Sequence, residues 1–266
     1  MAFERILLVG CGNMAGAMLR GWLAGGLAPS RFTVCDPATP ELPPGVATLP
    51  GLPEQGGFDA LLLGVKPQGL AQVAPQVEPL AGAGTVLFSI LAGVELAVLR
   101  RQFPRAQAVV RVMPNLAAAL GKSPIALAST DDSVRETASE LMRPLGMPEW
   151  IEETEFDLVT ALAGSGPAFV YRFIDALAAS SAELGLPADK ADRLALAMVE
   201  GAAALAAQSD VGPGELARRV ASPGGTTQAG LDVLDRESRL YRLAFDTLRA
   251  ARDRSAEMAE ETRGQG

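Results

Sequence analysis

A glycine-rich turn near the amino end of the chain carries the clearest chemical signal. The pattern Gly10-x-Gly12-x-x-Ala15 stands between a predicted strand and a predicted helix of about a dozen residues. Gly10 permits a tight turn, Gly12 lets a pyrophosphate approach the backbone, and Ala15 lets the helix pack closely on the strand. Together with Asn13 and Met14, these residues predict a dinucleotide-binding turn at a helix N-terminus.

Asp36 follows the second predicted strand. An acidic side chain there accepts hydrogen bonds from the adenosine ribose hydroxyls and repels a 2′-phosphate, which favours NAD over NADP. Two alternatives remain open at this point: Asp36-Pro37 is also a common way to start a turn, and Arg31 is close enough in sequence to bind a 2′-phosphate. The prediction is therefore a nicotinamide cofactor, NADPH or NADH.

Two further segments follow predicted strands at their carboxyl ends, where ligands bind in parallel sheets. In the first, Val65-Lys66-Pro67, the lysine is expected to contact the cofactor's phosphate or ribose, although a solvated surface charge is the alternative. In the second, Met113-Pro114-Asn115, the asparagine is either a cofactor ligand or a turn residue. We assign Val65, Lys66, Pro67 and Asn115 to the cofactor site.

A second turn lies far along the chain, in the sequence Ser222-Pro223-Gly224-Gly225-Thr226-Thr227. A Gly-Gly turn that feeds a helix exposes backbone N–H groups, and with nearby hydroxyl groups these make a carboxylate site. Taken alone, the same segment also fits a threonine N-cap after a flexible turn.

The chain contains no histidine. Histidine is the side chain best suited to titrate near neutrality, so catalytic triads and histidine-ligated metal sites are excluded, and we expect no metal. Any catalysis must use a cofactor's own chemistry, hydroxyl groups, carboxylates or lysines.

The first half of the chain alternates short apolar runs with helical stretches, the pattern of a mostly parallel sheet covered by helices. The segment 37–57 is rich in proline and glycine and is expected to be a loop with a short strand near Val46. The predicted strands are 5–9, 32–35, 61–65, 86–89, 109–112 and 125–128.

The second half consists of long stretches of helical period rich in alanine and leucine, including 168–183 and 189–208. We predict an α/β Rossmann-type domain over residues 1–153 and an all-helical domain over 154–266. The long helices have more apolar surface than one small helical layer hides, which indicates a homodimer formed through this domain; a monomer with a well-packed bundle is the alternative.

Composition limits the partners. The net charge of −8 argues against nucleic acid or an anionic membrane surface, and no apolar stretch is long enough for a bilayer span. The only cysteines, Cys11 and Cys35, are expected to be buried thiols in a reducing, cytoplasmic setting.

Five motifs follow one another along the chain: Gly10-x-Gly12-Asn13-Met14-Ala15, Val65-Lys66-Pro67, 111–115, 164–167 and 222–227 with Gly230-Leu231. Together they resemble the pyrroline-5-carboxylate reductase family over nearly the whole chain. The resemblance implies reduction of 1-pyrroline-5-carboxylate to L-proline, dimerisation through the helical domain, and in some members larger rings of dimers. It also implies that Ser222, Gly224, Gly225, Thr226 and Thr227 hold the substrate, with Thr227 as the catalytic hydrogen-bond donor to the ring nitrogen.

The chain departs from the family's usual pattern at Ala163, Leu116-Ala117, Lys122 and Arg219. These departures bear on affinity, substrate range and cofactor preference more than on reaction type. Two other functions stay open: a related reductase that acts on a larger cyclic imine or a 3-hydroxy acid, and a cofactor-sensing protein without catalysis. The stretch 166–182 contains no lysine, which argues against the 3-hydroxy-acid enzymes.

Overall fold

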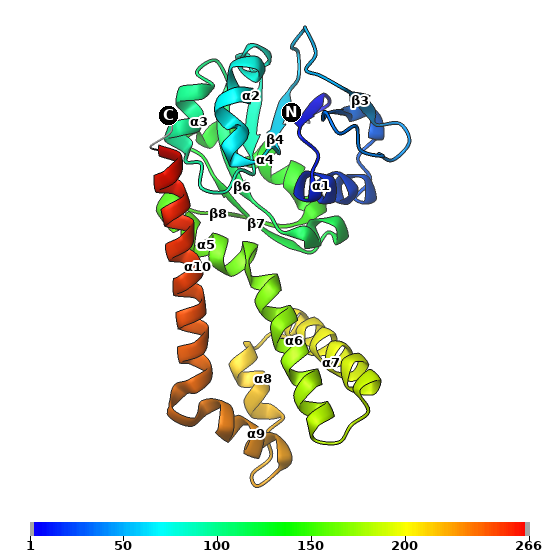
Figure 1. Ribbon diagram of the computed structural model, residues 1–266, viewed down its shortest axis with the longest axis vertical. Coiled ribbons are helices and arrows are strands. Elements are labelled where there is room, and N and C mark those ends of the chain that lie inside the picture. The colour runs from blue at the N-terminus through cyan, green and yellow to red at the C-terminus, as the bar shows by residue number, and fades with distance from the viewer. Residues whose placement is uncertain (1–2, 264–266) are drawn as a thin grey trace. The chain divides into compact units, whose positions relative to one another are not determined.

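The computed structural model describes residues 3–263 and divides into two compact units. The first unit holds the residues up to Ser165 together with those from Arg249 onward, and the second holds Gly166–Leu248 (Figure 1).

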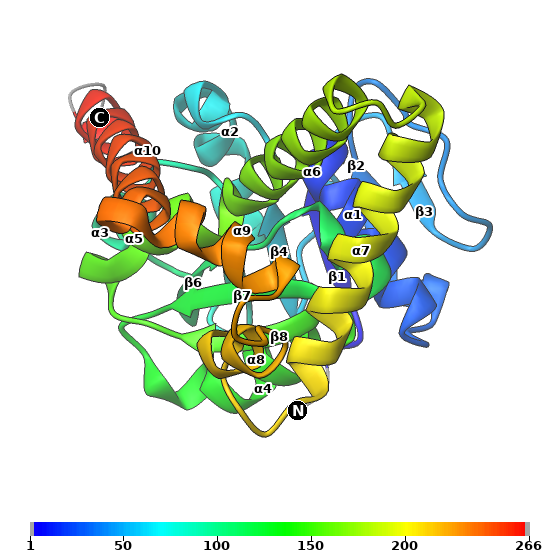
Figure 2. The same cartoon turned by 90° about the horizontal axis from the view of Figure 1, so that it is seen from below.

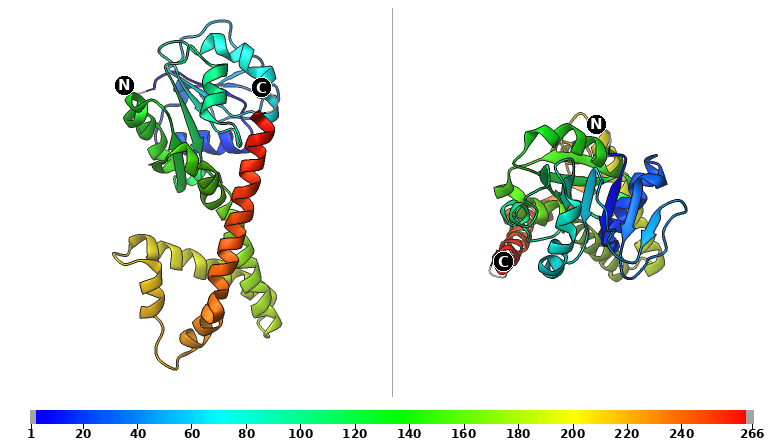
Figure 3. Two further views of the ribbon diagram at one scale, coloured as in Figure 1. Left: turned by 90° about the vertical axis from the view of Figure 1, so that its left-hand side faces the viewer. Right: turned by 90° about the horizontal axis from the view of Figure 1, so that it is seen from above.

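The first unit is built on one eight-stranded sheet in the order β3-β2-β1-β4-β5-β6-β7-β8. All neighbouring strands are parallel except β6 and β7, which are antiparallel, so the predicted mostly parallel sheet is confirmed. Figure 3 (right) shows β1 to β3 in blue at one edge of this sheet. The strands are β1 (Ile6–Val9), β2 (Phe32–Cys35), β3 (Ala47–Leu49), β4 (Ala60–Leu63), β5 (Val86–Ser89), β6 (Ala108–Met113), β7 (Ser123–Ala128) and β8 (Gly146–Trp150).

Helices cover both faces of the sheet because the strand residues are apolar on both sides. Ile6 and Leu8 join one core cluster, and the alternate residues Leu7 and Val9 join the other. The first face carries α1 (Asn13–Ala24), α4 (Arg135–Met142) and the 3-10 helix η4 (Leu116–Leu120), and the second carries α2 (Leu70–Val77), α3 (Leu96–Gln102) and α5 (Phe156–Val159).

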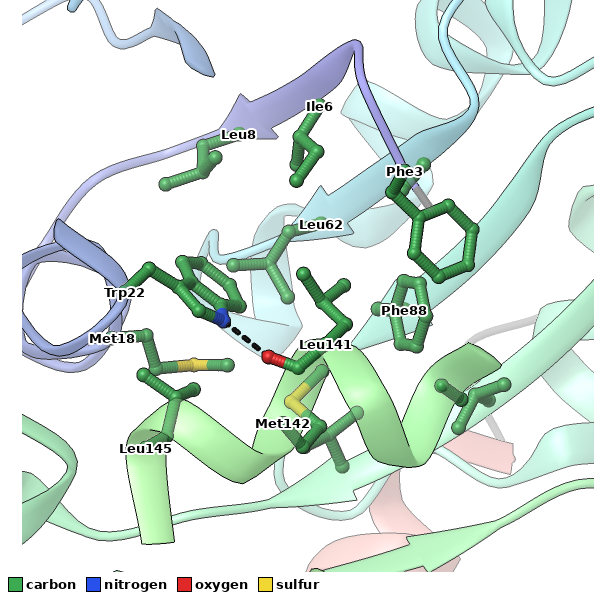
Figure 4. Packing of buried hydrophobic residues seen from close by; sticks show 14 of the residues in the cluster. Phe3, Ile6, Leu8, Met18, Trp22, Leu62, Phe88, Leu141, Met142 and Leu145 are labelled. Carbon is green, nitrogen blue, oxygen red and sulfur yellow. Dashed lines mark hydrogen bonds between the residues drawn. The ribbon is translucent and has the colours of Figure 1, made fainter. Parts of the chain in front are cut away.

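Trp22 of α1 joins three elements in the first core cluster. Its ring stacks on Phe32 with centroids 5.4 Å apart. Its indole Nε1 donates to the carbonyl oxygen of Leu141 at 2.7 Å (Figure 4). A buried indole N–H needs such a partner, so this bond fixes the distance between α1 and α4.

Short helical turns fill most of the connections between these elements. They are η1 (Pro29–Arg31), η2 (Pro67–Gly69), η3 (Glu78–Leu80), η5 (Asp132–Val134), η6 (Arg143–Leu145), η7 (Glu153–Glu155), the π-helical turn η8 (Thr160–Gly164) and η9 (Arg236–Ser238).

In the second unit, every element within residues 166–248 is helical. The helices α6 and α7 form an antiparallel hairpin, as Figures 1 and 2 show, and Gly185 ends α6 with a φ of 106° that suits glycine. Their shared core is small and made of alanine: Ala178, Ala191 and Ala195. The helices are α6 (Gly166–Glu183), α7 (Ala188–Gln208), α8 (Pro213–Arg219), α9 (Thr226–Asp235) and α10 (Arg239–Arg263), the last of which continues into the first unit.

The division between the units falls between Ser165 and Gly166, twelve residues beyond the predicted boundary at 153/154. The reason is that α5 still packs on the sheet, with Phe156 only 2% exposed. The end of α10 also returns to the first unit, where the Ser255 hydroxyl donates to the Asp157 carboxylate at 2.7 Å. The sequence analysis did not predict this return.

None of the helices within residues 3–263 meets the length and hydropathy needed to cross a bilayer by itself. The pair α7 and α8 meets them jointly, but with a bend of 114° between the two helices.

Candidate functional site

The glycine turn after β1 depends on the close approach of two backbones. Gly10 has a φ of +86°, a conformation that side chains disfavour. A Cβ added to Gly10 would lie 2.9 Å from the carbonyl carbon of Gly64, and one added to Gly64 would lie 2.7 Å from the Gly10 oxygen. Since Gly64 follows β4, these two glycines let the carboxyl ends of β1 and β4 meet.

The N-terminus of α1 opens onto free space beside this turn. Gly12 is the N-cap residue, no side chain caps the helix, and a Cβ added to Gly12 would find no atom within 4 Å. Asn13 is exposed, Met14 is half-buried, and Ala15 is buried against Gly64. The unpaired N–H groups of the first helical turn and the open Gly12 backbone fit a pyrophosphate.

A cavity of about 680 Å³ adjoins the turn. Gly12, Asn13 and Gly16 form one wall, and among the described residues Arg20 and Glu41 supply its charged side chains. Its size is within the range of roughly 300–1,000 Å³ typical of small-molecule sites.

Asp36 lies directly after β2 and points to the glycine turn. Its Oδ2 accepts a hydrogen bond from the Cys11 backbone N–H at 2.7 Å, and its Oδ1 accepts one from the Ala38 N–H at 2.8 Å. The side chain is half-buried. The orientation that the sequence left open is thus towards the predicted pyrophosphate turn.

Both cysteines next to this turn are buried free thiols. They belong to core clusters on opposite faces of the sheet, Cys11 with α1 and Cys35 with α2 and α3. Burial raises the pKa of the Cys11 thiol, and the negative charge of Asp36 raises it further. Burial and then Asp36 raise the pKa of the Cys35 thiol in the same way, so neither thiol has the character of a nucleophile at neutral pH.

The residues after β4 line the same edge of the sheet. Val65 and Pro67 are half-buried, and Lys66 is exposed as the N-cap residue of η2. Since β4 neighbours β1 in the parallel part of the sheet, Lys66 lies at the same carboxyl edge as the glycine turn.

Asn115 differs from the other predicted cofactor residues because its side chain is already occupied. It is 5% exposed, its Oδ1 accepts from the Ala117 N–H at 2.9 Å, and its Nδ2 donates to the Ala163 carbonyl at 2.9 Å. The side chain caps η4 and ties the end of β6 to the π-helical turn η8. These contacts favour a positioning role over cofactor contact.

Arg111 in β6 was not singled out as a site residue by the sequence analysis. It is 4% exposed, pairs with Glu153 at 2.8 Å and lies over the ring of Phe156 at 3.8 Å. Burial lowers the pKa of Arg111, and the hydrogen bond to Glu153 opposes that shift. The same Glu153 oxygen accepts from the Leu96 N–H at 2.7 Å. This group joins β6, α3 and α5. The sequence feature that could have revealed it is an arginine within an otherwise apolar strand.

The Ser222–Thr227 turn lies in the second unit and ends at the N-terminus of α9. Gly224 has a φ of +71°, and the Gly225 N–H donates to the Ser222 carbonyl at 2.9 Å. Gly225 is the N-cap residue and no side chain caps the helix, so the alternative of a threonine N-cap is wrong. Ser222, Thr226 and Thr227 are exposed, and their hydroxyl groups stand beside the free N–H groups of the first turn.

The structure therefore brings the predicted site residues together in two groups. The glycine turn, Asp36 and the residues after β4 share one edge of the sheet in the first unit, and the substrate residues share one turn in the second. Arg219, one of the departures from the family's pattern, pairs with Glu215 of its own helix at 3.0 Å.

Known proteins match the chain over nearly its whole length. Residues 153–258 match the family model described as pyrroline-5-carboxylate reductase dimerisation. Pyrroline-5-carboxylate reductase 2 of Bacillus subtilis (strain 168) is 34% identical over 272 residues, covering 98% of this chain and 97% of that protein. The chain belongs to the pyrroline-5-carboxylate reductase family. The reductase of Pseudomonas aeruginosa is 33% identical over 275 residues, covering 98% of this chain and 99% of that protein.

Solved structures of the pyrroline-5-carboxylate reductase family have the same fold. The reductase of Coxiella burnetii superposes with a TM-score of 0.86 at 27% identity, covering 97% of this chain and 99% of that one. The pyrroline carboxylate reductase of Plasmodium falciparum, solved with NADP bound, gives a TM-score of 0.81 at 23% identity over 97% of this chain and 100% of that one. The α/β domain followed by a helical domain is thus the family's architecture.

Proposed function

We propose that the chain is an oxidoreductase that reduces the C=N bond of 1-pyrroline-5-carboxylate to give L-proline, the last step of proline synthesis, with NADPH or NADH as the hydride donor. The observation that carries this proposal is the similarity to pyrroline-5-carboxylate reductases over 98% of the chain. The intact glycine turn and the intact Ser222–Thr227 turn support it.

The cofactor is held by the edge of the sheet. Gly10, Gly12 and the first turn of α1, with Asn13, Met14 and Ala15, cradle the pyrophosphate because they offer unpaired N–H groups and open space. Asp36 accepts from the adenosine ribose, and Lys66, between Val65 and Pro67, contacts the phosphates. When bound, the reduced nicotinamide supplies a hydride to the imine carbon.

The substrate carboxylate is held by the N-terminus of α9. The free N–H groups after Gly225 and the hydroxyls of Ser222, Thr226 and Thr227 offer several donors to one anion, and Gly224 and Gly225 leave room for it. The Thr227 hydroxyl donates to the ring nitrogen and stabilises the developing amine. A protonated imine accepts a hydride readily, so no histidine is needed.

The enzyme acts as a homodimer formed through the helical unit. The match to a dimerisation family model supports this, and so do large apolar side chains on α6 and α7 that the unit leaves outside its small core. Val170, Tyr171, Leu194 and Leu205 are 46%, 67%, 59% and 64% exposed. We further propose that the dimers assemble into rings, that the enzyme is cytoplasmic, and that it has no nucleic-acid or membrane partner. Light scattering measures the mass of the assembly.

The test is cofactor oxidation by the purified protein with 1-pyrroline-5-carboxylate and, separately, with its six-membered-ring analogue. Rapid turnover of the five-membered imine is expected. Thr227→Ala should lower kcat/KM by about 100-fold, whereas Thr227→Ser should retain most of it. Thr247→Ala, a threonine of the same unit outside the turn, is the matched control. Tight cofactor binding without turnover of either imine would refute the proposal in favour of a cofactor sensor or another substrate.

A further inference from the structure

The carboxylate of Asp36 is fixed before any cofactor arrives. One oxygen is held by the Cys11 N–H and the other by the Ala38 N–H, at 2.7 and 2.8 Å. Each carboxylate oxygen has a second acceptor position, so both can still accept a hydrogen bond from a hydroxyl group. Because Cys11 stands between Gly10 and Gly12, this rigid acceptor pair adjoins the predicted pyrophosphate turn.

We propose that this fixed carboxylate makes the enzyme selective for NADH over NADPH. The inference rests on the proposed function only in that a nicotinamide dinucleotide binds at the glycine turn. The 2′-hydroxyl of NADH donates a hydrogen bond to Asp36. The 2′-phosphate of NADPH carries only acceptor oxygens and negative charge towards the same carboxylate, which cannot turn away without losing its two backbone donors.

Arg31, the cation nearest to Asp36 in sequence, does not compensate. It pairs with Glu4 at 3.0 Å and donates to the Phe3 carbonyl at 3.5 Å, both before β1. Arg31 therefore lies at the amino end of the parallel strands β1 and β2, whereas Asp36 lies at their carboxyl end. The strand between them separates the two residues by about 16 Å, which is beyond the reach of the side chain.

Among the described residues, Arg20 is the cation that lines the cavity beside the turn, and the acid Glu41 lines the same cavity. Its Nη1 lies 3.5 Å from where a Cβ of Gly16 would be, so the guanidinium lies along α1 at the level of Gly16. The same position lies 3.9 Å from the Cys11 carbonyl oxygen and 4.0 Å from its Sγ, so the guanidinium lies beside the residue whose N–H holds the Asp36 carboxylate. Arg20 is therefore the cation to test as a partner for a 2′-phosphate.

The experiment measures the dissociation constants of NADH and NADPH by calorimetry, without imine substrate, so that a failure of catalysis does not affect the outcome. Wild-type protein should bind NADH about 100-fold more tightly than NADPH, which corresponds to about 2.7 kcal/mol. Asp36→Asn removes the charge and keeps the shape, and should reduce that ratio at least about tenfold. As a control, Glu54→Gln removes an exposed acid in the 50–57 loop and should leave the ratio of the two dissociation constants unchanged.

Arg31→Met should also leave NADPH affinity unchanged. The proposal is overturned if wild-type protein binds NADPH as tightly as NADH, or if Asp36→Asn folds and keeps the wild-type ratio. It is overturned likewise if Arg20→Met abolishes a wild-type preference for NADPH. Should Asp36→Asn fail to fold, the preference of wild-type protein for NADH still tests the proposal, and this preference should decrease with added salt. Salt screens the repulsion between Asp36 and a 2′-phosphate but does not weaken a hydrogen bond from a hydroxyl group.

Discussion

Replacing Gly12 by alanine separates cofactor binding from folding. Gly12 has φ −70° and ψ −164°, which alanine also adopts, and an added Cβ meets no atom within 4 Å. Alanine is a poorer N-cap residue by up to about 1 kcal/mol, and the smaller entropy of the unfolded chain offsets about 0.4–1 kcal/mol of that. We expect the free energy of unfolding to change by less than about 1 kcal/mol.

Cofactor binding should respond very differently to the same methyl group. It would stand in the space where the pyrophosphate contacts the backbone, and so would weaken one or two hydrogen bonds to a charged group. Their loss is worth about 2–3 kcal/mol, or about 30- to 150-fold in the dissociation constant. Calorimetric titration with NADH measures the affinity, and urea unfolding measures the stability.

Two further glycine variants serve as controls for this experiment. Gly82→Ala also adds a Cβ in open space but away from the turn, and should change neither quantity. Gly64→Ala forces its Cβ to 2.7 Å from the Gly10 oxygen, and should lower the free energy of unfolding by about 1–3 kcal/mol. If Gly12→Ala bound NADH within about threefold of wild type, no pyrophosphate would lie over Gly12 and the assignment of the turn would be wrong.

Three other perturbations test the packing around the site. Trp22→Phe leaves the buried Leu141 carbonyl without its 2.7 Å donor and should cost about 1–3 kcal/mol in urea unfolding, with near-native cofactor affinity. Arg111→Met leaves the partly buried Glu153 carboxylate without its ion-pair partner and should lower the free energy of unfolding by about 3 kcal/mol; a change below about 0.5 kcal/mol would show that the pair is dispensable. Burial raises the pKa of Cys11 above its ordinary 9.0, so the unfolded chain loses that proton first and stability should fall as pH rises past 9.0. Unfolding midpoints over a pH series should show a smaller fall for Cys11→Ala.

The parts of the fold that the sequence predicts are those with local causes. The glycine turn needs Gly10, Gly12 and Ala15 within one strand-turn-helix unit, so the pattern suffices. Strand β8 escaped prediction because its Pro148 and Glu149 interrupt any apolar run, and both are tolerated because β8 lies at an edge of the sheet.

The parts that the sequence does not predict depend on partners far along the chain. The direction of the Asp36 carboxylate is set by the Cys11 N–H, and the occupation of the Asn115 side chain is set by the Ala163 carbonyl. The role of Arg111 depends on Glu153 in the same way. No residue near any of them in sequence reveals these contacts, because each is made by an element that the fold brings alongside.

The return of α10 to the sheet unit bears on how the protein is made. The Ser255 hydroxyl and the buried Ala259 belong to that unit, although more than eighty residues of helical unit precede them in the chain. On the ribosome, the nucleotide-binding half would therefore emerge early but lack its closing segment until synthesis is nearly finished. A nascent chain stalled before Arg249 would present the α5 surface uncovered, at the stage when chaperones select their clients.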